Sequence, residues 1–75
     1  MANTKVNSIL FKEEMRRNGY TLETLSVKLG RSRTGLFNKI HNLSEFRASE
    51  IATITDLFKL NKAKKDAIFF APDVE

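Results

Sequence analysis

The sequence predicts an all-α fold, a compact bundle of about five short helices in one domain spanning residues 1–75. Apolar residues recur at helical spacing through most of the chain, and no run of four or more residues alternates as a strand would. The chain also contains no repeat, no low-complexity segment and no stretch with the composition of a linker. These observations favour a single helical domain over a mixed or multidomain protein.

The composition excludes several classes of protein. The chain has no cysteine and one histidine, His41, so disulfides, thiolate zinc sites and cysteine nucleophiles are absent. Glu13 and Glu14 are neighbours that face different directions on a helix, so they form no acid–base pair. We therefore expect no enzyme, no catalytic residue, no metal and no cofactor, and we interpret the chain as a binding module.

The first helix is expected over residues 6–18. Ile9, Leu10 and Met15 are available to the core along this segment. Asn18 and Gly19 follow, and both residue types readily adopt the left-handed conformation that ends a helix.

The second and third helices are expected over residues 22–29 and 32–41, with N-caps at Thr21 and Ser32. The buried stripe of the second helix is Leu22, Leu25 and Leu29, and Gly30 ends it. Leu36 and Ile40 share one face of the third helix, opposite the polar Thr34, Asn38 and His41. Two short helices joined by a tight glycine-containing turn are typical of a helix-turn-helix.

The fourth and fifth helices are expected over residues 48–58 and 62–69. The apolar stripe of the fourth helix is Ile51, Ile54 and Phe58. Asn61 caps the fifth helix, whose Ala67 and Ile68 are expected to pack inward, and Pro72 prevents much continuation.

The basic charge is concentrated in the middle of the chain. The formal net charge is +4. Between residues 28 and 47 the sequence has one acidic residue, Glu45, and five basic residues, which are Lys28, Arg31, Arg33, Lys39 and Arg47. Such an island indicates either a polyanionic partner or an ordinary solvated face.

No membrane-spanning or targeting segment is predicted. The longest apolar run near either end is Ile68–Ala71, whereas a span needs about 20 residues. The N-terminus lacks a signal-peptide core. We therefore expect a cytoplasmic protein without a membrane partner.

The segment from Gly19 to Thr34 reads GYTLETLSVKLGRSRT. It resembles the helix-turn-helix of the phage Cro and repressor family, also called XRE-like, with the pattern G-Y-T-x-E-x-L-A-x-x-L-G-x-S-x-x-T/S. The later segments FRASEI (46–51) and IFFA (68–71) are similar to small Cro-like proteins of phages from Gram-positive bacteria. The resemblance spans about residues 7 to 72 and implies a lambda-repressor-like DNA-binding domain.

The resemblance implies that the start of the third helix enters the major groove of operator DNA in a bacterial host cell. Arg33 could then bind guanine, Asn38 could pair with adenine, and Thr34 could contact a thymine methyl group or a phosphate. Phe37 either closes the core beside Phe46 or contacts a thymine methyl group. The expected phosphate contacts are Thr21, Lys28, Arg31, Ser32, Lys39 and Arg47.

Four positions depart from the family pattern. Leu22 stands where many members have a glutamine that contacts phosphate, and Ser26 replaces an alanine at the helix crossing. Arg31 replaces an aliphatic turn residue and adds a cation. Gly35 costs about 1 kcal/mol relative to alanine in a helix and offers no side chain to a base.

Three apolar residues remain unassigned after the core is filled: Val27, Phe69 and Phe70. They either form an association surface, which would support a homodimer on a pseudo-palindromic operator, or cap the small core.

Two functions fit these patterns. The first is a Cro-like transcriptional regulator of the lysis–lysogeny switch that binds operator DNA through its third helix. The second is an antirepressor that covers the helix-turn-helix of a partner phage repressor. Leu22, Gly35 and the modest net charge favour the second, whereas Arg31 and Arg33 favour the first.

Overall fold

The computed structural model of the chain describes residues 4–72. Its five helices are α1 (Ser8–Arg17), α2 (Leu22–Leu29), α3 (Arg33–Ile40), α4 (Ala48–Leu57) and α5 (Lys62–Phe69). Strand β1 (Thr4–Lys5) pairs antiparallel with β2 (Ala71–Pro72), and Lys5 lies opposite Ala71. The prediction of a compact helical fold is confirmed, and every expected helix boundary lies within two residues of the observed one. A two-residue strand is too short for alternation to reveal.

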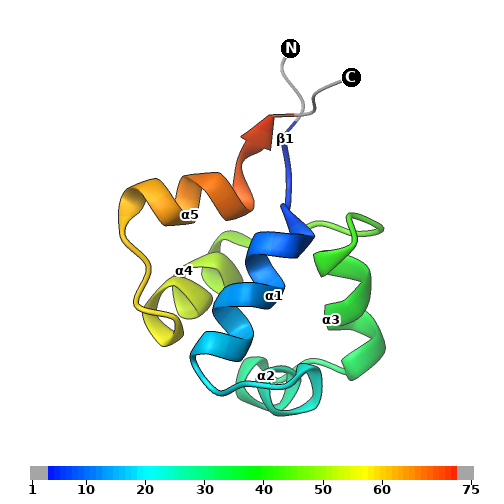
Figure 1. The fold of residues 1–75 in the computed structure, drawn as a ribbon. Coiled ribbons are helices and arrows are strands. Elements are labelled where there is room, and N and C mark those ends of the chain that lie inside the picture. Colours follow the sequence, from blue (N-terminus) through cyan, green and yellow to red (C-terminus); the bar gives the residue numbers. More distant parts are fainter. Residues whose placement is uncertain (1–3, 73–75) are drawn as a thin grey trace.

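The helices surround α1, which lies between α3 and α4 in Figure 1. Helix α2 closes one end of the molecule, and α5 lies toward the other end, where β1 and β2 bring the two ends of the described chain together. This arrangement leaves one side of α2 and α3 facing outward, away from the other helices.

The helix starts follow the predicted capping residues. At Thr21, Ser32 and Asn61 the side-chain oxygen accepts a hydrogen bond from the backbone N–H three residues later. The donor–acceptor distances are 3.1 Å for Thr21, 3.0 Å for Ser32 and 2.8 Å for Asn61. These bonds satisfy backbone donors that a helix leaves free at its first turn. The predicted caps at these three residues are confirmed.

The turns before and after α2 each contain a glycine with a positive φ. Gly19 has φ +79° and Gly30 has φ +67°, and both values lie in the left-handed region that glycine adopts without steric cost. The N–H of Arg31 then donates to the Ser26 carbonyl at 2.9 Å, so the chain turns sharply into Ser32. The short α2–α3 connection is therefore fixed by backbone conformation.

An aromatic cluster forms the centre of the core. Phe11 is fully buried and stacks on Phe46, with ring centroids 5.8 Å apart and an interplanar angle of 20°. Edge-to-face contacts join Phe11 to Phe58 at 5.6 Å and to Phe69 at 6.0 Å. The other buried apolar residues are Met15, Leu25, Leu36, Ile40, Ile54 and Ile68.

Helix α1 buries a different stripe from the one expected. Ile9 is 72% exposed, whereas Phe11 is fully buried. The buried face is Phe11, Glu14 and Met15, which follows the i, i+3, i+4 spacing of one helix face. The expectation for Ile9 was wrong because Glu14 interrupts the apolar pattern at a buried position.

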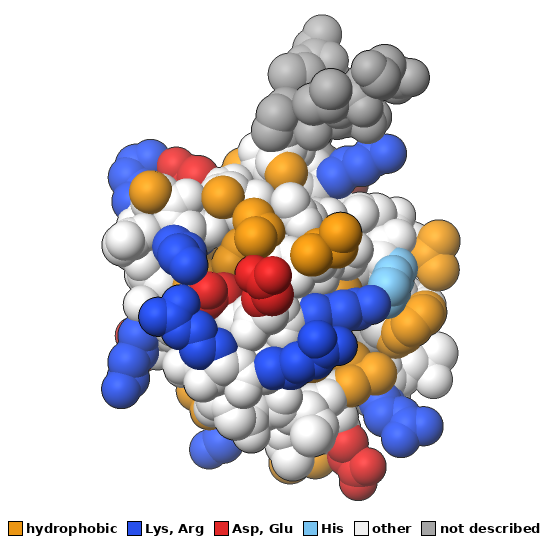
Figure 2. Space-filling model, viewed as in Figure 1, with side chains coloured by type: hydrophobic (Ala, Val, Ile, Leu, Met, Phe, Trp, Pro, Cys, Tyr) orange, Lys and Arg blue, Asp and Glu red, His pale blue; other side chains and the backbone are white. Residues whose placement is uncertain are grey.

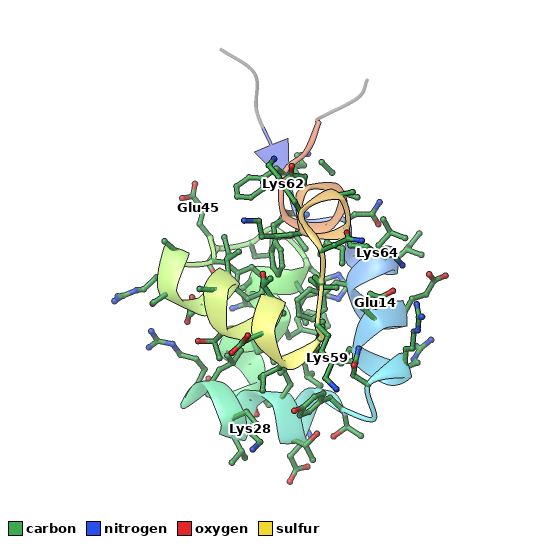
Figure 3. All side chains as sticks on the ribbon, turned by 90° about the vertical axis from the view of Figure 1, so that its left-hand side faces the viewer. Glu14, Lys28, Glu45, Lys59, Lys62 and Lys64 are labelled. Carbon is green, nitrogen blue, oxygen red and sulfur yellow. The ribbon has the colours of Figure 1, made fainter. Side chains whose placement is uncertain are left out.

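Helix α5 also differs from the expectation in detail. Ala67 is exposed, and Ile68 and Phe69 are the residues that pack inward. Lys64 on this helix reaches the buried carboxylate of Glu14 on α1, with Nζ 3.0 Å from Oε2 (Figure 3). This ion pair explains how an acidic residue lies on the buried face of α1.

Candidate functional site

The first turns of α2 and α3 open onto one shallow hollow on the outer side of the helix pair. The hollow is lined by Thr21, Leu22, Glu23, Arg33, Thr34 and Phe37. Thr21 is the N-cap of α2, and Ser32 directly precedes Arg33 as the N-cap of α3. Helix N-termini carry partial positive charge, so both helices present their anion-attracting ends near this surface.

Arg33 and Thr34 are available to a partner. The Arg33 side chain is 66% exposed, and its closest acidic partner is Glu23, with Nη1 3.9 Å from Oε1. Glu23 is itself 75% exposed. A loose ion pair in solvent contributes little, so Arg33 can leave it at small cost. Thr34 is exposed beside it.

Beyond the hollow, Phe37 on α3 contacts His41 at the C-cap of the helix, and Leu43 follows in the loop; we name these three residues the apolar strip. The rings of Phe37 and His41 lie with centroids 4.2 Å apart, and Phe37 is 46% exposed. Leu43 is 71% exposed. Figure 2 shows apolar side chains gathered around the histidine on the side of the molecule where α3 lies. Phe37 thus lies at the surface and does not close the core beside Phe46.

Asn38 is less accessible than its predicted role requires. It is partly buried, and its backbone carbonyl accepts hydrogen bonds from the N–H groups of Leu43 at 2.7 Å and Ser44 at 3.3 Å. These bonds hold the loop after α3 against the helix. Arg33 and Thr34 are therefore the more accessible members of the expected base-reading set.

The inner side of the pair contains a buried carboxylate bound by two cations. We name the Glu50 cluster for its four members: Glu50, Arg31, Lys39 and the backbone N–H of Arg47. Arg31 Nε donates to Glu50 Oε2 at 2.6 Å, and Lys39 Nζ donates to both carboxylate oxygens at 2.6 and 2.8 Å. The N–H of Arg47 donates to Oε1 at 2.8 Å. The cluster joins the α2–α3 turn, the end of α3 and the start of α4.

The Glu50 carboxylate is ionised at neutral pH. Burial alone would raise its pKa, but the hydrogen bonds from Arg47, Lys39 and Arg31 outweigh burial and lower the pKa from 4.5 to about 2. A buried charge left without partners would be costly, so the cluster requires its two cations.

The Glu50 cluster shows that the basic residues between positions 28 and 47 do not all have the same role. Lys39 is 14% exposed and binds Glu50 through its ammonium group, so its charge is committed to the buried carboxylate. Arg31 is 39% exposed and has only its Nε committed to Glu50. Lys28 and Arg47 are exposed, and Thr21 and Ser32 act as helix caps. The expected phosphate set therefore divides into accessible and committed members.

The expected association residues do not form one surface. Phe69 is 4% exposed and belongs to the aromatic core, so its placement at an interface was wrong. Val27 is 74% exposed on α2, and Phe70 is 45% exposed just after α5. These two elements lie at opposite ends of the molecule (Figure 1). Val27 and Phe70 therefore do not form one continuous patch on the protein.

The site residues that the sequence did not single out are Glu23, Glu50 and Leu43. Glu50 stands at the third helical position of α4 and accepts from the N–H of the N-cap, but that N-cap is Arg47 and not the serine or threonine of a capping box, so no signature marked it. Its partners Arg31 and Lys39 lie 19 and 11 residues away, and no local pattern connects them. Leu43 lies in a loop, where periodicity gives no information.

Comparison with known proteins adds no relative. The chain matches no protein-family model, no curated protein and no solved structure. Within residues 4–72 no acidic, histidine or cysteine side chains are grouped so that they could bind a metal ion. None of the helices in the same range is long and apolar enough to cross a bilayer. The functional argument therefore depends on the outer side of α2 and α3.

Proposed function

We propose that the protein is a phage transcriptional regulator of the Cro type that binds operator DNA in the cytoplasm of a bacterial host. In this proposal α2 and α3 act as a helix-turn-helix, and α3 enters the major groove. The regulator would control the choice between lysis and lysogeny by occupying a promoter region.

One observation carries the proposal. The capped N-termini of two eight-residue helices open onto the same hollow, and an exposed arginine and threonine follow at the start of the second helix. Helix N-termini orient phosphates, and arginine is suited to the two acceptor atoms of guanine. The shape and the chemistry of this face match what a major-groove reader needs.

The residues divide into two roles in this mechanism. Arg33 and Thr34 would contact base edges, with Asn38 as a further contact deeper along α3. Phosphate contacts would come from the capped helix starts and from exposed cations beside them, which are Lys28, Arg31 and Arg47. Phosphate contacts set the position of α3 but carry no sequence information.

The direct test is a titration of the purified protein against labelled DNA from beside its own gene, at two salt concentrations. Unrelated DNA serves as competitor. Specific binding that weakens steeply with salt supports the proposal; with five phosphates neutralised, the log–log slope is about −4.5. A folded protein that binds both DNAs equally weakly overturns it.

The apolar strip supports a second function. Phe37 is exposed on the helix that would otherwise meet DNA, Leu43 is exposed in the loop after it, and Glu23 lies beside Arg33 on the outer side. Apolar side chains gain little from contact with phosphates, and carboxylates are repelled by them, whereas both kinds of group can pack or pair at a protein interface. An antirepressor that covers the helix-turn-helix of a partner phage repressor would use these residues.

Phe37→Ala separates the two functions. The antirepressor is favoured if Phe37→Ala no longer binds the partner repressor while Arg33→Ala still binds DNA as the wild type does. Loss of specific DNA binding in Arg33→Ala, with no complex between wild-type protein and repressor, would favour the DNA-binding regulator. Size-exclusion chromatography of each variant mixed with the purified repressor measures whether the complex forms.

A further inference from the structure

We infer that Glu50 is a positioning residue that holds the Arg31 guanidinium in place for a DNA phosphate, while Lys39 neutralises Glu50 and makes no phosphate contact. This inference deepens the proposed function and rests on it. By this inference an acidic residue strengthens DNA binding, although its negative charge alone would be expected to weaken it.

The geometry of Arg31 provides the first step. Its Nε donates to Glu50 Oε2 at 2.6 Å, and its side chain is 39% exposed. Its two terminal amino groups form no hydrogen bond within residues 4–72. A guanidinium is planar, so anchoring its Nε on a carboxylate restricts the direction of the edge formed by the two terminal amino groups. That free edge has the paired donors that bind a phosphate bidentately.

The rigidity of Glu50 provides the second step. Its side chain is 6% exposed, and both carboxylate oxygens are engaged by Lys39. The backbone N–H of Arg47 adds a contact from the start of α4. Glu50 is therefore held by α3 and α4 independently of Arg31, and it can serve as a fixed anchor.

The position of Arg31 in the chain provides the third step. Arg31 directly precedes Ser32, the N-cap of α3, and two residues later comes the exposed Arg33. A phosphate bound at Arg31 would lie beside the start of the helix that meets the bases. An arginine held in its bound orientation loses less conformational freedom on binding than a free one.

The charge balance provides the contrast that makes the inference testable. Lys39 is 14% exposed and reaches both oxygens of Glu50, so it already offsets the buried negative charge. Removing the carboxylate charge raises the net charge of the protein by one. Simple electrostatics then predicts tighter DNA binding, whereas loss of positioning predicts weaker binding. The two accounts differ in sign.

The test measures DNA affinity at several salt concentrations for wild type, Arg31→Ala, Glu50→Gln and the double variant. We expect Arg31→Ala to weaken binding about tenfold and to make the salt slope shallower by about 0.9. Glu50→Gln should also weaken binding, despite its added positive charge. The double variant should bind no more weakly than Arg31→Ala, because the effect of Glu50 passes through Arg31.

Two controls keep the test clear of unfolding. Circular dichroism establishes that each variant is folded at the assay temperature. Arg31→Lys keeps the charge and the fold but loses the planar fork, so it should bind DNA more weakly than wild type.

The possible results separate the inference from the proposed function. Tighter or unchanged binding by folded Glu50→Gln, with normal binding by wild type, overturns the positioning role alone. Equal binding by Arg31→Lys and wild type does the same, because charge would then suffice. A wild-type protein that binds no DNA overturns the proposed function and this inference with it.

Discussion

The inner and outer sides of the α2–α3 pair use similar residues for opposite purposes. On the inner side Leu36 is fully buried, and the ammonium group of Lys39 is bound to a buried carboxylate. On the outer side the next residue, Phe37, is 46% exposed, and Arg33 has only a loose partner at 3.9 Å. The inner side maintains the fold, whereas the outer side retains side chains that a partner can engage.

The comparison shows that cations close in the sequence are not equivalent. The stretch from residue 28 to 47 has a charge excess when counted along the chain. In space Glu50 joins this stretch and binds Arg31 and Lys39. The positive charge that this stretch offers to a nucleic acid is therefore lower than the count along the chain suggests.

The largest expected effect compares two adjacent residues of α3. Leu36→Ala should lower the free energy of unfolding by about 2–5 kcal/mol, because it removes a fully buried side chain and leaves a cavity. Phe37→Ala is the matched control on the outer side and should cost less than about 1 kcal/mol. Urea unfolding followed by circular dichroism measures both values. Equal losses for the two variants would show that the two sides are not distinct.

The Glu50 cluster gives the next largest effect, as a dependence of stability on pH. The folded pKa of Glu50, about 2, lies below its ordinary value of 4.5. A depressed folded pKa contributes stability above pH 4.5 that is lost as the pH falls toward 2. The loss should be about 3 kcal/mol over that window.

Glu50→Gln is the control for this pH dependence. The variant should have lower stability at neutral pH and a flatter profile between pH 4.5 and pH 2. The measurement is the free energy of unfolding in urea at a series of pH values. Parallel profiles for variant and wild type would exclude Glu50 as the source of the acid sensitivity.

On the outer side, Arg33→Ala should weaken specific DNA binding by about 1–3 kcal/mol and relax the preference at one base position. Its unfolding free energy should change by less than about 0.5 kcal/mol, since its ion pair with Glu23 is loose and exposed. Arg17→Ala is the matched control, because Arg17 is 71% exposed at the end of α1. Equal losses of affinity in both variants would point to general charge instead of base reading.

The smallest effect concerns the turn between the two helices. Gly30→Ala should cost about 1–2 kcal/mol of stability, because alanine is strained at φ +67°. Beyond the two chain neighbours the added Cβ would meet no atom within 4 Å, so the cost comes from the local backbone conformation and not from packing against the rest of the protein. Gly30→Asn should lose less, since asparagine tolerates this conformation better. Thermal unfolding distinguishes the two variants, and equal melting temperatures would contradict the backbone explanation.

Much of the fold could be predicted because its signals are local. Thr21, Ser32 and Asn61 cap helices through bonds to residues three positions away, so their role is visible in a short window of sequence. Gly30 ends α2 through its own backbone conformation. The exposure of Thr34 likewise follows from the positions of Leu36 and Ile40 on the opposite face of one short helix, whereas Arg33 lies nearer their face and is exposed at the first position of α3.

The features that could not be predicted depend on contacts distant in sequence. Glu14 lies on the buried face of α1 because Lys64, 50 residues later, reaches its carboxylate. Without that knowledge the apolar pattern selects Ile9 and passes over Phe11. Phe69 is buried because Phe11 and Phe46 meet it in the core. Lys39 is an interior residue because of Glu50, which belongs to a different helix.

The most direct test of the account is to map which backbone amides of the isotopically labelled protein shift on adding operator DNA. The account predicts that the largest NMR chemical-shift changes occur at residues 21–24 and 31–38. Residues 59–66, at the start of α5 and the loop before it, should change little, although this segment also contains several lysines. Shifts concentrated on α5, or none anywhere, would contradict the assignment of function to the outer side of α2 and α3.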